Sequence, residues 1–119
     1  IQGVCPPGWH MPKTSETTTL TTFLGGVGVS GGKMKETGQV HWNSPNSSAA
    51  NTYGYTALGS GYAYSGSFSS LKTYGHNWNA TTGTTGNDAW YFGSGYNTSG
   101  TLTQQALKTT GYPVRCLRD

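Results

Sequence analysis

A cysteine and a histidine lie five positions apart near the start of the chain, in the segment CPPGWHMP at residues 5–12. A thiol beside an imidazole can perform nucleophilic catalysis, with Cys5 as the nucleophile and His10 as its base. Such a site also needs an orienting third group and an oxyanion-binding site, and no motif in the sequence marks either of them. The three prolines of the segment leave little freedom to align the pair. We therefore expect no enzymatic activity.

Histidines and acidic residues are too scattered to predict a metal site. His10, His41 and His76 lack the short spacings of zinc motifs, and four acidic residues in 119 positions are too few for a calcium site. The GGK segment at residues 31–33 lacks the spacing of a phosphate-binding loop, and Met34 stands where that loop needs a Ser or Thr. We expect neither a metal ion nor another cofactor.

Aromatic and amide residues gather in the second half of the chain, in NWNAT (77–81), AWYF (89–92) and GYN (95–97). Aromatic faces stack on sugar rings, and Asn side chains both donate and accept hydrogen bonds toward hydroxyl groups. Residues of these types also dominate protein-binding surfaces. A glycan or a surface protein is therefore the expected ligand, with candidate binding residues Trp78, Asn79, Trp90, Tyr91, Tyr96 and Asn97. The alternative is that Trp78, Trp90 and Phe92 are core residues on alternating strands.

Charge and hydropathy narrow the range of partners. The formal net charge is +3, charged residues make up 9% of the chain, and no basic stripe is present, so a nucleic acid is not expected as a partner. No run of 18 apolar residues predicts a membrane span. Glycosylation sequons begin at Asn46, Asn79 and Asn97. The sequence starts at Ile1 without Met, which is typical of a processed product or of an excerpt from a longer chain.

The composition favours short strands and turns, because Gly, Ser, Thr and Asn fill nearly half of the chain. One helix is predicted over residues 15–24, where Leu20, Phe23 and Leu24 form an apolar stripe and Gly25 and Gly26 follow as a stop signal. The segment at residues 27–38 is predicted to be a glycine-rich loop. Strands are predicted at residues 55–58, 61–64, 77–81, 89–92, 102–105 and 112–117.

The two cysteines, Cys5 and Cys116, stand near the two ends of the sequence. This placement, in a Thr-rich and Asn-rich chain of low charge, indicates one disulfide in an exported protein; the alternative is a pair of buried thiols in a cytoplasmic protein. Alternation along residues 112–117 places Cys116 on an inward face. The chain-entropy model gives such a large loop about 4 to 5 kcal/mol of stabilisation.

Eight segments of the chain, taken in order, resemble the Fibrobacter succinogenes major paralogous domain family, which is common in secreted and surface proteins of the Bacteroidetes/Fibrobacter group. These segments are CPPGWHMP, LTTFLGG, GGKMKETG, HWNSPN, GYTALGSGY, GSFSSL, YGHNW and VRCLRD. Together they extend over essentially the whole chain.

The family is similar in its helix block to formylglycine-generating-enzyme-like domains and is generally grouped with the C-type lectin-like fold, so the resemblance implies that fold. It implies a single α+β domain over residues 1–119, with terminal strands side by side, Cys5 bonded to Cys116, and Trp9 in the core. The chain departs from the family pattern at Thr17, where Trp is usual, and at Pro113, where Ser is usual. A double Trp followed by serines is usual where this chain has residues 77–80. The chain also lacks the strand-forming region that normally precedes the Cys-Pro segment.

Two classes of function are consistent with this sequence. The first is a non-catalytic recognition or adhesion module on the outer surface of a bacterium, which requires exposed aromatic side chains in a concave site. The second is a structural, glycosylated subunit of an extracellular filament or matrix, in which a strand from a neighbouring copy completes the sheet. The second class would bury the same aromatic residues between copies of the chain.

Overall fold

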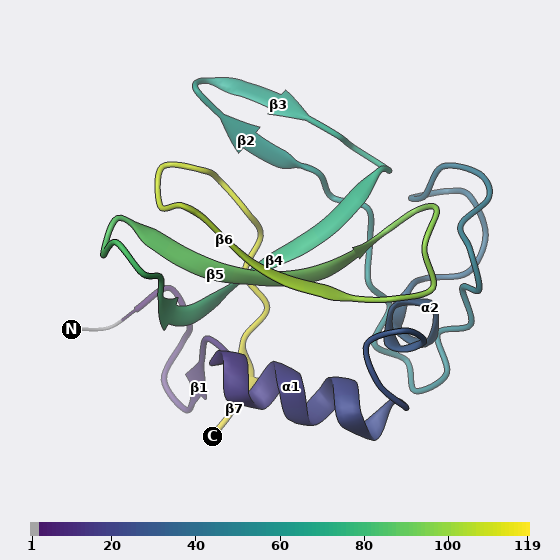
Figure 1. Cartoon of the computed structure of the whole chain (residues 1–119), viewed down its shortest axis with the longest axis horizontal. Helices are drawn as coiled ribbons and strands as arrows, with labels where there is room; N and C mark the ends of the chain where they lie inside the picture. The colour runs from purple at the N-terminus through teal and green to yellow at the C-terminus, as the bar shows by residue number, and fades with distance from the viewer. Residues whose placement is uncertain (1–2) are drawn as a thin grey trace.

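A three-stranded antiparallel sheet lies at the centre of the structure, a computed structural model that describes residues 3–119. The sheet has the order β4-β5-β6, α1 lies on one side of it, and the β2–β3 hairpin lies on the other (Figure 1). The short terminal strands β1 and β7 pair with each other. The elements are β1 (Trp9–His10), α1 (Thr14–Phe23), α2 (Ser30–Met34), β2 (Tyr62–Tyr64), β3 (Ser67–Ser69), β4 (Tyr74–Thr82), β5 (Asp88–Gly95), β6 (Leu102–Leu107) and β7 (Leu117–Arg118).

The predicted helix is present, and its predicted apolar stripe is buried in part: Leu24 is 3% exposed, and Leu20 packs against the core cluster. The helix starts where Glu16 accepts a hydrogen bond from the Lys13 backbone N–H (2.8 Å), and it ends at two glycines with positive φ. Phe23 was expected in the core and is 67% exposed. Thr17 and Thr21 are buried instead, because the Thr21 hydroxyl donates to the Thr17 carbonyl within the helix and so needs no water.

The glycine-rich segment contains a short helix, α2, where only a loop was predicted. Gly31 and Gly32 are buried, and the Gly32 N–H donates to the Ser99 carbonyl (2.8 Å). A Cβ on Gly31 would collide with the Gly100 carbonyl oxygen, so only glycine lets α2 approach the β5–β6 loop this closely. Lys35 follows α2 and is fully buried, with Nζ donating to the carbonyls of Gly95 (2.9 Å) and Thr98 (2.8 Å).

Four of the six predicted strands lie within or largely coincide with observed ones: residues 61–64 overlap β2, 77–81 lie in β4, 89–92 in β5 and 102–105 in β6. Residues 55–58 form no strand and make one parallel bridge, between Ala57 and Lys35. Residues 112–117 form a strand only at Leu117, because Pro113 has no N–H to donate to a neighbouring strand. The Pro113 carbonyl accepts a hydrogen bond from the Trp78 N–H (3.0 Å).

The core gathers beside α1, where Leu24, Met34 and Phe92 form a buried cluster. Trp9 was predicted to lie in this core, and that prediction is wrong. The Trp9 side chain is 45% exposed, because the two-residue strand β1 lies against β7 and not against the central sheet. Trp42 is the fully buried tryptophan, and its indole N–H donates to the Ala57 carbonyl (2.9 Å).

The disulfide between Cys5 and Cys116 is confirmed. Their Cα atoms lie 5.8 Å apart although the two residues are 111 positions apart in the sequence. The adjacent pairing of Trp9 with Arg118 and of His10 with Leu117 brings the terminal strands side by side, as the resemblance implied.

Candidate functional site

The second half of β4 is distorted, and the distortion creates a pocket. Trp78 pairs with Tyr91 and Thr82 pairs with Ala89, so β4 advances four positions while β5 advances two. A bulge of this kind turns side chains away from regular alternation. Two contacts hold it against the segment before α1: the Ala80 N–H donates to the Pro12 carbonyl (2.7 Å), and the Thr14 N–H donates to Thr81 Oγ1 (3.0 Å).

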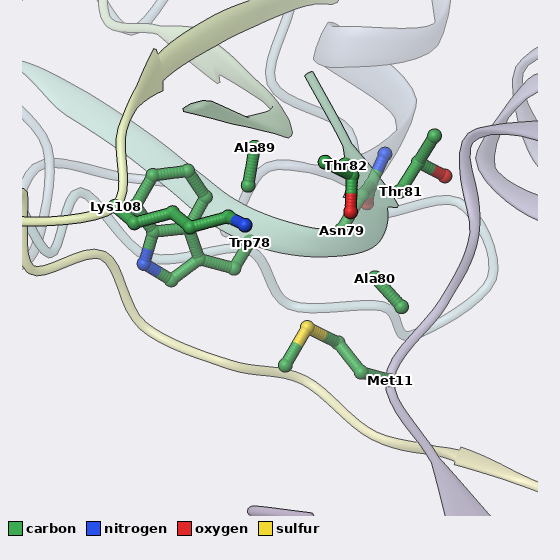
Figure 2. Close-up of a pocket in the computed structure, with 8 residues that line it drawn as sticks. All are labelled: Met11, Trp78, Asn79, Ala80, Thr81, Thr82, Ala89 and Lys108. Atoms are coloured by element: carbon green, nitrogen blue, oxygen red, sulfur yellow. The ribbon is translucent and has the colours of Figure 1, made fainter. Parts of the chain in front are cut away.

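The pocket at this bulge has a volume of about 300 Å³. Figure 2 shows the Trp78 indole and the Lys108 side chain on one side of it, Thr81 and Thr82 on the other, and Met11 reaching in from the N-terminal segment. Asn79, Ala80 and Ala89 complete the lining. The site therefore combines an indole face with hydroxyl groups and one ammonium group, and it contains no carboxylate.

A cluster of aromatic rings packs behind the pocket and fixes the indole of Trp78. Tyr112 meets Trp78 edge to face, with ring centroids 4.8 Å apart, and it packs on Tyr91 at the same distance. The Tyr91 hydroxyl donates to Gln104 Oε1 (3.0 Å). Burial raises the pKa of Tyr112 to about 12, so the ring stays uncharged at physiological pH. Because its neighbours are locked, the indole is held in one orientation before any ligand arrives.

The structure brings together only part of the predicted binding residues. Trp78 and Asn79 line the pocket, although Asn79 is buried and its amide donates to Thr17 Oγ1 (3.2 Å). Tyr91 is buried behind Trp78, on the same face of the sheet. Trp90 is half-buried and, as the next residue on β5, points to the opposite face. Phe92, the third residue of the core alternative, is buried.

Tyr96 and Asn97 lie away from this pocket, in the loop between β5 and β6. The pocket contacts β5 at Ala89 near its start, whereas Tyr96 follows its end at Gly95. Six strand residues separate these points by about 20 Å. Tyr96 is half-buried and its N–H donates to the Thr73 carbonyl (3.0 Å), while Asn97 is exposed.

Three residues line the pocket from outside the segments that the sequence reasoning singled out: Met11, Thr82 and Lys108. They come from the N-terminal segment, the end of β4 and the residue after β6. Their convergence depends on the bulge and on the β5–β6 register, for which the sequence carries no local signal that we recognise.

The three predicted glycosylation residues differ in access. Asn46 and Asn79 are 6% and 3% exposed. The Asn46 amide donates to the carbonyls of Glu36 (2.9 Å) and Gly38 (2.7 Å), so a glycan on either of these two residues would displace native hydrogen bonds. Asn97 presents an exposed side chain in a loop.

His10 belongs to a second polar cluster, formed with two carboxylates. Its Nε2 lies 2.7 Å from Glu16 Oε1 and its Nδ1 lies 2.6 Å from Asp119 Oδ1. These hydrogen bonds, with the Glu16 bond the stronger influence, raise the pKa of His10. Both ring nitrogens are engaged, and Cys5 is held in the disulfide, so the Cys5–His10 nucleophile pair is not available. Within residues 3–119, no group of three or more His, Cys, Asp or Glu side chains could hold a metal ion.

Neither helix of the described residues has the length and apolar character needed to cross a membrane.

The family model of the Fibrobacter succinogenes major domain matches residues 1–118. No curated protein and no solved structure matches the chain significantly. Because the match extends over nearly the whole sequence, the chain belongs to the Fibrobacter succinogenes major domain family.

Proposed function

We propose that this domain is a non-catalytic recognition module at the outer surface of a bacterium, with a C-type lectin-like fold, and that the Trp78 pocket binds a neutral saccharide. The observation that supports this proposal best is the half-buried indole held at the side of a pocket of about 300 Å³. Volumes of this order lie at the lower end of small-ligand sites, which suits one or two sugar rings.

The polar groups around the indole favour a hydroxylated ligand over an apolar one. The Thr82 side chain is exposed at the pocket and can both donate and accept hydrogen bonds. Lys108 is exposed, and its Nζ already donates to the Gly86 carbonyl (2.7 Å), which leaves two further donors for ligand oxygens. The pocket lacks a carboxylate or a metal ligand, so we propose recognition by stacking and hydrogen bonding alone.

The export of the domain is part of this proposal. The disulfide between Cys5 and Cys116 supports it, because disulfides persist in oxidising environments outside the cytoplasm. Localisation of the native protein by cell fractionation, with and without surface proteolysis, would test it. Recovery of the protein only from the cytoplasm, with both thiols reduced, would contradict the proposal.

A glycan array followed by titration of the best ligand would test the saccharide site. Thr82→Val removes one hydroxyl and keeps the side-chain shape, and we expect it to weaken binding by about 5-fold to 10-fold, the value of one hydrogen bond. Thr103→Val is the matched control, because Thr103 is an exposed threonine on β6 that does not line the pocket.

Replacement of the Trp78 indole should weaken saccharide binding more than Thr82→Val does. Trp78→Ala should abolish measurable binding, whereas Trp90→Ala, on the opposite face of β5, should leave it unchanged. The thermal transition of each variant reports whether it still folds. If Trp78→Ala and Thr82→Val both remain folded and bind as the original chain does, the ligand does not occupy this pocket.

A further inference from the structure

Apolar side chains are exposed together at the end of the molecule that carries the β2–β3 hairpin. The exposed fractions are 92% for Phe68, 75% for Val40, 71% for Leu71 and 42% for Leu58. Figure 1 shows this hairpin standing apart from the central sheet. We call these four residues the hairpin surface.

Part of the hairpin surface is a groove. Val40, Leu58 and Leu71 line a depression of about 330 Å³, together with His41, Gly59, Ser60 and Lys72. Its walls come from three separate segments of the chain, and backbone hydrogen bonds join them: the Gly59 N–H donates to the His41 carbonyl (3.2 Å), and the Lys72 N–H donates to the Gly59 carbonyl (2.6 Å). The groove is therefore already formed without an occupant.

Phe68 is not among the residues that line this groove, and its side chain remains almost fully exposed. Phe68 lies on β3 only three positions before Leu71, which lines the groove. A phenyl ring in water, next to an empty apolar depression that it does not fill, indicates a surface that another molecule covers.

The backbone of β3 is also unprotected. Ala63, opposite Phe68 in the hairpin, exchanges both of its backbone hydrogen bonds with Gly111 (2.8 and 2.7 Å), so the backbone N–H and carbonyl of Phe68 point outward from the other edge. Residues 60–71 contain no charged residue and no proline, the usual devices that keep an exposed edge from pairing.

We propose that the occupant is a second copy of this chain, and that the two copies form a two-fold dimer in which Phe68 of each enters the groove of the other. The exposed parts of the four side chains amount to on the order of 500 Å² per copy, taking an aromatic side chain at about 150–250 Å². A standard stable interface needs about 800 Å² per partner, so the hairpin surface would supply most of it.

The position of Phe68 next to the groove selects a closed dimer over an open chain. A head-to-tail filament requires the two complementary features on different sides of the molecule, whereas a two-fold axis between adjacent features joins both at once. The docked segment brings no charge into the groove, because residues 60–71 carry none. The only ammonium group in the lining, that of Lys72, can remain at the rim in water.

Sedimentation velocity over a wide range of protein concentration tests the dimer. We expect the intact chain to dimerise reversibly, and Phe68→Ser to weaken the dimer by about 1000-fold, since an anchor residue at each of two contacts is worth about 30-fold. Leu71→Asp should weaken it comparably by placing a carboxylate in the groove. Val27→Asp is the matched control, because Val27 is 66% exposed in the loop after α1, outside the hairpin surface.

Mixing the two variants separates this arrangement from other modes of association. Phe68→Ser retains an intact groove and Leu71→Asp retains Phe68, so an equimolar mixture should form mixed dimers that neither variant forms alone. A mixture that stays monomeric would overturn docking of Phe68 in the groove. An intact chain that is monomeric throughout, or that grows into open polymers, would overturn the two-fold dimer.

The dimer does not depend on the proposed saccharide site. Leu71 and Lys72 precede the start of β4, whereas Thr81 and Thr82 of the pocket lie at its end, about 25 Å away along the strand. Thr82→Val should therefore keep the dimer, and Phe68→Ser should keep any saccharide binding. Loss of the dimer in Thr82→Val would also overturn the assignment of the interface to the hairpin surface.

Discussion

Replacement of His76 by phenylalanine should remove most of the acid sensitivity of this fold. The His76 ring is 6% exposed, and its Nε2 has no hydrogen-bond partner. Three phenol rings surround it, those of Tyr74, Tyr91 and Tyr112, with centroids 5.2, 4.9 and 5.8 Å away. None of them can pair with a positive charge as a carboxylate does, so burial lowers the pKa of His76 from 6.5 to about 4.

The sign of the pH dependence follows from this lowered pKa. The unfolded chain takes up a proton near pH 6.5, whereas the folded chain holds His76 neutral until about pH 4. The full stability is therefore present above pH 6.5 and is lost progressively as the pH falls toward 4. At pH 4 the loss of unfolding free energy should reach about 3 kcal/mol, since each pKa unit is worth about 1.4 kcal/mol.

Urea unfolding, followed by tryptophan fluorescence between pH 7 and pH 4, would measure this loss. Phenylalanine keeps the ring packing and removes the unpaired nitrogen, so His76→Phe should be as stable as the original chain at pH 7, or about 1 kcal/mol more stable. His41→Gln is the control, since the His41 side chain is 52% exposed. If His76→Phe loses as much stability at pH 4 as the original chain, the His76 argument is wrong.

The remaining predictions concern the other histidine cluster and the central sheet. The raised pKa of His10 means that its bonds to Glu16 and Asp119 stabilise the fold fully below pH 6.5 and lose this effect as the pH rises through the raised value. His10→Gln should therefore abolish a decrease in melting temperature on the alkaline side of pH 6.5, measurable by circular dichroism; an unchanged decrease would contradict this role. Gly93→Ala should destabilise the domain by more than about 3 kcal/mol, because its Cβ would overlap the Gly75 carbonyl of β4. Gly28→Ala, where a Cβ meets no atom within 4 Å, is its control in the same unfolding assay, and equal stability of the two variants would refute the packing argument.

Local signals in the sequence were sufficient for the elements whose structure is decided locally. The helix was predicted within one residue at each end, because a glycine pair terminates it and Glu16 supports its first turn. The middle of each strand of the central sheet was predicted from its aromatic and threonine residues. The disulfide was predicted from the placement of the two cysteines near the ends of a Thr-rich and Asn-rich chain of low charge.

Burial of individual tryptophans could not be predicted in the same way. Trp9 and Trp42 stand in segments of similar composition, yet one is 45% exposed and the other fully buried. What separates them is a distant glycine: Gly75 of β4 leaves the space that the Trp42 ring fills, and a Cβ there would lie 2.9 Å from its Cη2. Contacts between segments this far apart leave no periodicity to detect.

Only part of the candidate site could be predicted, for the same reason. Trp78 was recognisable because an aromatic residue between asparagines is typical of a binding surface. Trp90, between Ala89 and Tyr91, was an equal candidate in the sequence, and only strand alternation against Tyr91 directs it to the other face. The bulge that recruits Thr82 and Lys108 arises from the two extra residues in β4, which follow no motif.

The bond between Cys5 and Cys116 has a mechanical consequence for this domain. Tension applied along the chain before Cys5 and after Cys116 passes directly across this disulfide, so the residues between the two cysteines bear no load. Without it, complete extension of the 111 intervening steps would release about 370 Å of chain. With it, the domain is a nearly inextensible link whose fold keeps its shape under tension.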